Sequence, residues 1–180
     1  MRKTPALIPF AAATSLGLIA ACAGITQSYA VYPRYSASDA TYAAADRDLK
    51  VIVLGNPTAL PKDRFESAVA LAMQGKNFQH GTRFTVTPGA SWRADYRVVV
   101  AFGAPANASG SVYCRYAAPP EPVAGQQPIR MVLAFCDGEA LLSEVLASTP
   151  SVAAPGELDR LMADTLRALM PAVSPGRRGN

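Results

Sequence analysis

The chain has 180 residues, half of them hydrophobic, and it carries 17 Lys and Arg against 13 Asp and Glu, a formal charge of +4. This length suits one domain with additional segments. The only basic cluster is Arg177 and Arg178 in a Pro- and Gly-containing end. Composition therefore excludes the concentrated basic patch that a nucleic-acid-binding protein presents, and no nucleic-acid partner is predicted.

The beginning of the chain has the layout of a secretory signal. Arg2 and Lys3 precede an apolar run over residues 6–21, and Cys22 follows small residues. The run is shorter than the roughly 20 apolar residues that cross a bilayer, which argues against a permanent span. The end of the run together with the cysteine, Leu18 to Cys22, reads Leu-Ile-Ala-Ala-Cys and resembles the lipobox of bacterial lipoproteins.

This resemblance implies cleavage before Cys22, a diacylglycerol on its sulfur and an acyl group such as palmitate on the new amino terminus. The predicted signal peptide is then residues 1–21. The mature protein would be held on the bilayer through Cys22, facing the periplasm of a bacterial cell envelope. Ala23 stands where an aspartate signals inner-membrane retention in that family, which favours the outer membrane. The alternative is an ordinary secreted protein cut after Ser28, Tyr29 and Ala30.

The three cysteines fit an exported protein if Cys22 is lipidated. Cys114 and Cys136 then remain as an even pair in an oxidising compartment, which predicts a disulfide. A hairpin centred near Gly125 would place the two opposite each other. The alternative is two buried free thiols, since unpaired cysteine often behaves as a small hydrophobe.

Residues 22–48 show no apolar period that would bury a face. We expect the lipidated cysteine to be followed here by a flexible tether. Four of the seven tyrosines lie in this stretch, and the alternative interpretation is that they form an adhesive patch: Tyr29, Tyr32, Tyr35 and Tyr42.

The first half of the predicted domain contains two strands and a helix. The β-branched run over residues 49–54, ended by Gly-Asn-Pro, predicts a buried strand. Apolar residues such as Phe65, Val69 and Met73 recur at helical spacing from Pro61 to Gly75. Alternation over residues 82–87 predicts a strand with one solvated face.

The second half contains four more expected strands and a closing helix. Residues 96–102 predict a central strand buried on both faces, followed by strands over 111–117 and 129–136. Asp137-Gly138 predicts a two-residue type I′ hairpin, and therefore a strand over 139–147, although that spacing also fits a short helix. Residues 156–170 follow the helical period closely, and residues 172–180 are expected to form a disordered tail.

Together these elements predict a single α+β domain over residues 49–171. We expect a two-layer sandwich in which a largely antiparallel sheet of about five to six strands carries two amphipathic helices on one face, in the order βαβββββα. This order resembles small envelope lipoproteins such as the lipopolysaccharide-assembly lipoprotein and the auxiliary lipoproteins of ABC transporters. The resemblance rests on element order, and no functional residue follows from it.

The sequence offers no catalytic set. The single histidine, His80, has no neighbouring nucleophile or carboxylate, and no cofactor or metal site is predicted. We expect a non-catalytic binding or accessory module whose partner is another envelope protein. The alternative is a small periplasmic hydrolase in which scattered Asp and Glu meet in space. The candidate contact residues are aromatic: Trp92, Tyr113 and Tyr116.

Overall fold

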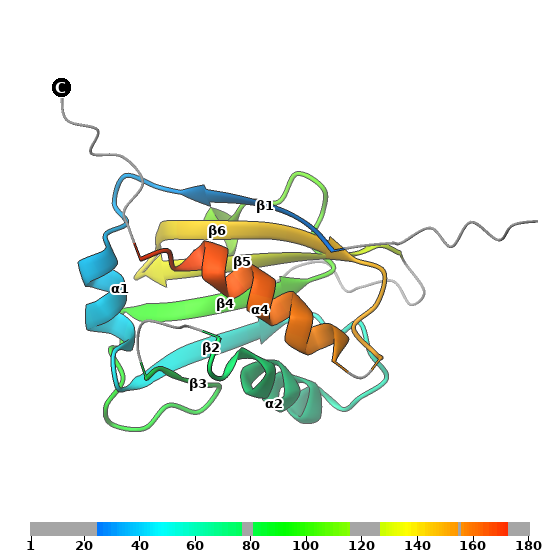
Figure 1. The fold of residues 1–180 in the computed structure, drawn as a ribbon, viewed down its shortest axis with the longest axis horizontal. Helices are drawn as coiled ribbons and strands as arrows, with labels where there is room; N and C mark the ends of the chain where they lie inside the picture. The colour runs from blue at the N-terminus through cyan, green and yellow to red at the C-terminus, as the bar shows by residue number, and fades with distance from the viewer. Residues whose placement is uncertain (1–24, 77–80, 116–126, 155, 173–180) are drawn as a thin grey trace, which may run out of the picture.

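A six-stranded mixed sheet and four helices make up the part of the chain that the computed structural model describes, residues 25–76, 81–115, 127–154 and 156–172 (Figure 1). In chain order the elements are β1 (Thr26–Val31), α1 (Ala37–Ala44), β2 (Asp48–Leu54), α2 (Lys62–Met73), β3 (Arg83–Thr85), β4 (Tyr96–Phe102), α3 (Gly110–Cys114), β5 (Ile129–Asp137), β6 (Ala140–Thr149) and α4 (Glu157–Leu169).

The sheet is antiparallel on one side and parallel on the other. Its strand order is β1-β6-β5-β4-β2-β3. The pairs β1–β6, β6–β5 and β5–β4 are antiparallel, whereas β2 runs parallel to both β4 and β3. α2 connects β2 to β3, as a parallel pair requires a crossover. β4 and β5 are therefore central, and β1 and β3 form the two edges.

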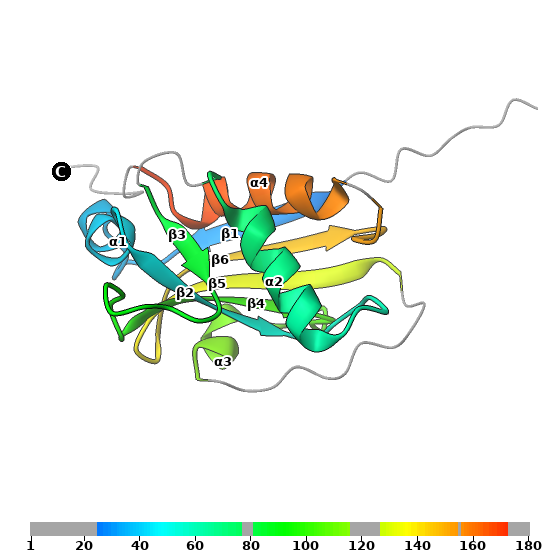
Figure 2. The same cartoon turned by 90° about the horizontal axis from the view of Figure 1, so that it is seen from below.

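One face of the sheet, here called the first face, carries the main core. α1, α2 and α4 pack against it, and Figure 2 shows α2 and α4 on the same side. Alternate residues of β4 supply Val98, Val100 and Phe102, and Phe65 of α2 meets Phe102 edge to face with ring centroids 5.1 Å apart. Side chains return to the same face of a helix about every 3.6 residues and to the same face of a strand every 2 residues. The apolar residues at these spacings therefore face each other across the core.

The opposite, second face carries a smaller apolar cluster. It contains Val99 and Ala101 of β4, Val132 and Ala134 of β5, and Tyr113 of α3. Figure 2 shows α3 on this side, across the sheet from α2 and α4. β4 is thus buried on both faces, as its continuous Val run predicts.

The α+β class and most elements of the domain are confirmed. β2, α2, β3, β4, β5 and α4 fall where their patterns predict them. The stretch over residues 139–147, which also fitted a helix, is the strand β6. Its hairpin differs in one detail. Asp137 pairs with Ala140, so Gly138 and Glu139 form the loop, and Glu139 lacks the positive φ that a type I′ turn requires.

The predicted order and layering were wrong in three respects. Residues 111–117 were expected to form a strand, but Gly110–Cys114 is the helix α3, and the hairpin centred near Gly125 is therefore not the route by which Cys114 meets Cys136. The two predicted amphipathic helices, α2 and α4, share one face, but α3 covers part of the second face, so the sheet is not covered on one side only. The parallel pairing of β2 was missed because local hydrophobic patterns carry no information about strand partners.

The expected tether was wrong for residues 26–44, which form β1 and α1. β1 is an exposed edge strand, so it shows no apolar alternation. α1 buries alanines only, so it shows no apolar stripe. The folded domain therefore extends to Thr26 and does not begin at residue 49. The predicted signal peptide, Cys22 and most of the predicted tail lie outside the described residues.

Candidate functional site

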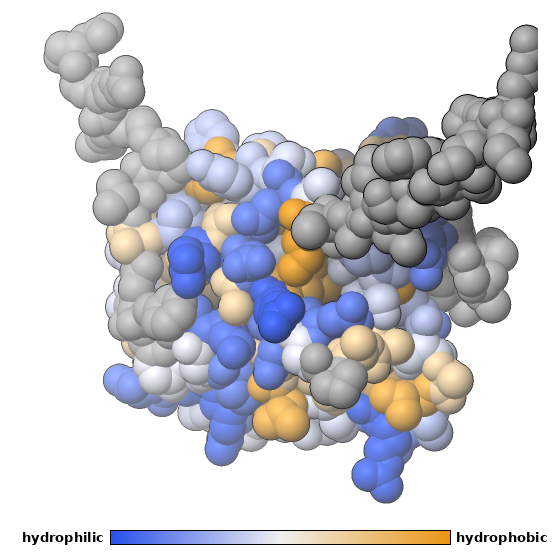
Figure 3. Space-filling model, turned by 45° about the vertical axis from the view of Figure 1, so that its right-hand side comes forward, coloured by the Kyte–Doolittle hydropathy of each residue, from blue (hydrophilic) through white to orange (hydrophobic). Residues whose placement is uncertain are grey.

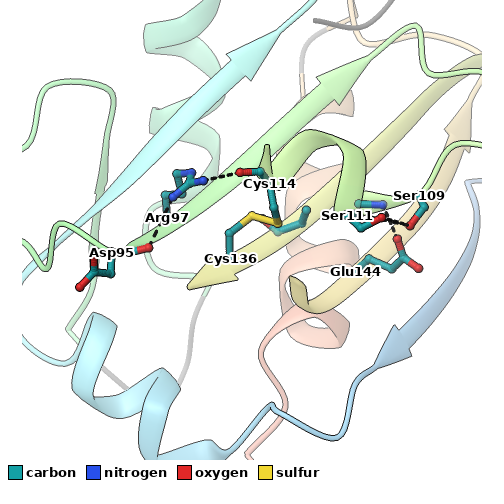
Figure 4. The surroundings of a disulfide bond; sticks show 9 residues. Asp95, Arg97, Ser109, Ser111, Cys114, Cys136 and Glu144 are labelled. Atoms are coloured by element: carbon teal, nitrogen blue, oxygen red, sulfur yellow. Dashed lines mark hydrogen bonds between the residues drawn. A yellow bond between two sulfur atoms is a disulfide. The ribbon is translucent and has the colours of Figure 1, made fainter. Parts of the chain in front are cut away.

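A short helix, α3, is held on the second face at both of its ends (Figure 4). The Ser109 hydroxyl caps its first turn by accepting from the Ser111 N–H at 3.3 Å. A Cβ on Gly110 would lie 2.9 Å from Leu141 Cδ1 and 3.0 Å from Ala134 Cβ. Glycine is therefore required for this helix to approach the sheet so closely.

Glu144 of β6 links α3 to the end of β1. One carboxylate oxygen accepts from the Gly110 N–H at 2.5 Å, and the other accepts from the Tyr32 hydroxyl. Glu144 is only 8% exposed, and both of its oxygens find their hydrogen-bond donors inside the protein, as buried polar groups normally do. The hydrogen bond to Glu144, with burial and the carboxylate charge, raises the pKa of Tyr32 to about 12.

A disulfide and an arginine hold the other end of α3. Cys114 and Cys136 form the predicted disulfide, with Cα atoms 5.7 Å apart, and both are fully buried. The guanidinium of Arg97, itself 3% exposed, donates to the Cys114 carbonyl. Figure 4 shows Arg97 and the disulfide side by side above the sheet. A cation at the last carbonyls of a helix is electrostatically favourable.

An open groove of about 370 Å³ lies on the same face. Four segments line it: residues 26–28 of β1, 104–106 after β4, 130–132 of β5 and 146–148 of β6. Pairing places Ser28 opposite Leu146 and Arg130 opposite Ser148, so these side chains share the second face. Val132 and Leu146 supply an apolar floor.

The rim of the groove is polar and carries one charge. Arg130 is exposed, and it is the only charged residue among those that line the groove. The Thr26 and Ser148 hydroxyls lie 2.6 Å apart and hydrogen bond across the two strands. An apolar floor, hydroxyls and one guanidinium suit a neutral polar or anionic ligand. Proton transfer by a carboxylate is not available from this lining.

A second buried carboxylate, Asp48, lies at the start of β2. Its oxygens accept from the Gly89 N–H at 2.6 Å and from Arg83 Nε at 2.5 Å. The Gly89 hydrogen bond and the Arg83 charge lower the pKa of Asp48, against burial, which raises it. A general acid needs a raised pKa, so Asp48 is suited to holding the loop at Gly89 and not to acid catalysis.

The sequence-predicted contact residues do not form one exposed patch. Trp92 is half-buried, and the Lys50 ammonium lies 5.2 Å from its ring centre. Tyr113 is 3% exposed in the second-face cluster, which leaves its ring little surface for a partner. Tyr116, His80 and Cys22 lie outside the described residues. Sequence reasoning missed the groove, because its lining comes from four distant segments.

The described residues show neither a metal cluster nor a membrane-spanning helix. Within them no group of three or more His, Cys, Asp or Glu is arranged to hold a metal ion. None of their helices is both long enough and apolar enough to cross a membrane.

Comparisons with known proteins give similarity at the level of structure. No family profile matches the chain, and no curated protein matches it. A dodecameric single-substitution variant of PelC from Paraburkholderia phytofirmans is 15% identical with a TM-score of 0.45, over 82% of this chain and 98% of that one. A second PelC dodecamer from the same organism is 12% identical with a TM-score of 0.41, over 85% and 100%. Both similarities are too low to support an inference about activity.

Proposed function

We propose that the protein is a membrane-anchored bacterial envelope lipoprotein whose domain binds another envelope component without catalysis. The observation that carries the proposal is the position of Cys22 directly after Leu-Ile-Ala-Ala, behind a basic and then apolar leader. The disulfide between Cys114 and Cys136 supports it, because Cys22 is then the one cysteine left over. Ala23 favours the outer membrane, with the domain facing the periplasm.

The groove is the proposed binding site. Its apolar floor and polar rim are typical of binding sites, and Arg130 gives it one positive charge. The ligand chemistry that fits is a polar or anionic group on the partner, paired with Arg130, beside an apolar portion against Val132 and Leu146. The alternative of a hydrolase with paired carboxylates finds no acidic residue in this lining.

Lipidation is tested by growing cells with an alkyne-labelled palmitate. The wild-type protein should incorporate the label and sediment with membranes, and Cys22→Ser should lose both properties. The double variant with Cys114→Ser and Cys136→Ser is the matched control, because it removes two cysteines yet should keep the label. Label retained by Cys22→Ser would contradict the proposal.

Binding is tested by photocrosslinking in whole cells. A photoreactive residue at Ser28, in the groove, should capture a partner, whereas the same residue at the exposed Arg160 of α4, on the first face, should not. Arg130→Ala should weaken the capture at Ser28, and Arg160→Ala should leave it unchanged. Equal capture from both positions would show that the groove is not the binding site.

A further inference from the structure

Three described loops at one end of the sheet contain no charged residue. β2 and β4 run in parallel and finish at this end, and β6 finishes there too because Thr149 pairs with Ile129 at the start of β5. The loops that follow these strands are residues 55–61, 103–109 and 150–154. They consist entirely of Gly, Ala, Pro, Ser, Thr, Asn, Leu and Val. We call this set of loops the uncharged end.

The opposite end of the sheet is rich in charge. Its described loops carry both signs, on Arg34, Asp46, Arg47, Lys76, Arg93, Asp95 and Glu139. At the uncharged end Leu60 is 49% exposed, and Ala59, Pro105 and Ala153 are exposed beside it or on the neighbouring loops. In Figure 3, which turns this end forward, orange hydrophobic areas lie among the hydrophilic ones along the lower edge.

The chain also enters the sheet at the uncharged end. Thr26 pairs with Ser148, so β1 begins beside the end of β6. Thr26 lies four positions after Cys22, and a fully extended chain spans at most about 14 Å over four positions. β6 has ten residues. A strand of that length extends over roughly 34 Å, so the anchor cannot reach from Thr26 to the opposite end of the sheet.

We propose that the uncharged end lies against the bilayer surface, with loops 55–61, 103–109 and 150–154 at the level of the lipid head groups. The inference rests on the proposed lipidation of Cys22 and deepens it by naming the surface that meets the lipid. Uncharged loops approach the interface without the cost of dehydrating charged side chains. Exposed Leu60 gains by leaving water.

Among the residues that the structure describes, the charges nearest the uncharged end fit this arrangement. Lys62 and Asp63 in the first turn of α2, Glu157 in the first turn of α4 and Arg130 of β5 lie just behind the loops. Lys62 is paired with Glu66 at 3.6 Å, and its side chain is 84% exposed. Lys62 can meet anionic head groups, which attract a basic residue near such a surface.

The test uses the lipidated full-length protein in phosphatidylethanolamine–phosphatidylglycerol vesicles with brominated acyl chains, which quench nearby tryptophan. The only tryptophan, Trp92, lies between β3 and β4 at the charged end. It serves as the internal control and should keep its emission. Leu60→Trp in a Trp92→Phe background should lose most of its emission in brominated vesicles and none in unbrominated ones. Ala59→Trp in the same background gives the same readout if Leu60→Trp disturbs the loop.

The outcomes separate this inference from the proposed function. The intact mass of the purified protein first reports whether Cys22 is acylated, and a chain without acyl groups overturns the lipoprotein proposal itself. Acylated protein in which neither Leu60→Trp nor Ala59→Trp is quenched overturns only the orientation. Quenching of Trp92 to the same degree would show a domain lying flat on the bilayer and would also overturn it.

Discussion

Glu144 is a single side chain on which three elements depend. It lies in β6, and its two oxygens receive the Tyr32 hydroxyl from beyond β1 and the Gly110 N–H from the start of α3. Hydrogen bonds to an ionised carboxylate are about twice as strong as neutral ones. The residue is 8% exposed, so loss of either donor leaves a buried oxygen unsatisfied.

Tyr32 makes the stability of the protein sensitive to alkaline pH. Its pKa is about 12 in the folded protein, against an ordinary value of 10, so the folded state keeps a proton that the unfolded chain releases. The resulting stabilisation is complete below pH 10 and is lost as pH rises through about 12. We expect the urea-unfolding free energy to fall less steeply over this range in Tyr32→Phe than in the wild type.

The matched control for Tyr32 is Tyr29→Phe, because Tyr29 is 66% exposed on β1. This variant should follow the wild-type pH profile. Tyr35, whose pKa burial and then Asp39 raise to about 12, contributes equally to all three proteins. Identical slopes for Tyr32→Phe and the wild type would contradict the role assigned to the bond between Tyr32 and Glu144.

Position 110 requires glycine because there is no room for a Cβ, and not because of its backbone conformation. An added Cβ would lie 2.9–3.0 Å from atoms of Leu141, Ala134 and Glu144, on two strands. Gly110→Ala should lower the free energy of unfolding by about 1–3 kcal/mol, the usual cost of overfilling a packed site. Val112→Ala is the control on the same helix, where the 50% exposed side chain predicts a change within about 0.5 kcal/mol. If Gly110→Ala left the free energy of unfolding unchanged, it would show that α3 can move freely on the sheet.

Among the elements, β1 and α1 show what local patterns omit. Ser36 caps the start of α1, and its hydroxyl accepts from the Asp39 N–H at 3.0 Å. A Ser followed three residues later by an acid is a recognisable helix start, and it was the one local signal for this helix. β1 offers no such signal, because its pairing partner β6 lies far along the chain.

Removal of β1 and α1 should destabilise the domain. Tyr35, Ala40, Ala43 and Ala44 are at most 4% exposed in the main core, and the Tyr35 hydroxyl donates to the Pro171 carbonyl at 2.6 Å. Burial of one large side chain alone stabilises by roughly 1.5–3 kcal/mol. A chain beginning at Arg47 should unfold at lower urea concentration than one beginning at Ile25. Equal midpoints would restore the interpretation of this segment as a tether.

The disulfide should stabilise α3 and the whole domain. Its cysteines are 22 positions apart, and closing such a loop contributes about 3 kcal/mol by restricting the unfolded chain. The double variant Cys114→Ala and Cys136→Ala should lose a stabilisation of this order in urea unfolding, and hydrogen exchange should speed up in α3 before β4. Cys22→Ser, measured in parallel, should unfold as the wild type does. Unchanged exchange in α3 would contradict the prediction.

At the scale of the whole molecule, the sequence predicted those parts that bury a continuous apolar face. α4 and α2 show the helical period, and the Val run of β4 predicts burial on both sides. α3 has five residues, too few for a helical period, and the alternation of Val112 and Cys114 imitates a strand. The disulfide follows from cysteine parity, but its geometry does not, because it joins a helix to a strand.

A longer link to the proposed anchor at Cys22 should release the uncharged end from the bilayer, if the proposed orientation holds. A flexible Gly/Ser insertion of about 20 residues between Gly24 and Ile25 would extend the link by roughly 25 Å. Quenching of Leu60→Trp by brominated lipid should then fall, while membrane sedimentation stays unchanged. A rigid-body shift of this kind leaves the groove and α3 intact, so photocrosslinking at Ser28 serves as the control for folding. Unchanged quenching would show that the loops bind lipid without help from the short link.

The pairing of β1 with β6 also determines the order in which the protein can fold. Thr26 and Ser148, which hydrogen bond across these strands, are 122 positions apart, whereas β5 and β6 are joined by a two-residue loop. Contacts between distant residues form late, because they close long loops. A chain synthesised from its amino terminus releases β1 first and β6 almost last. β1 therefore waits for nearly the whole chain to emerge before its partner strand arrives, and during that interval its edge is open to a chaperone.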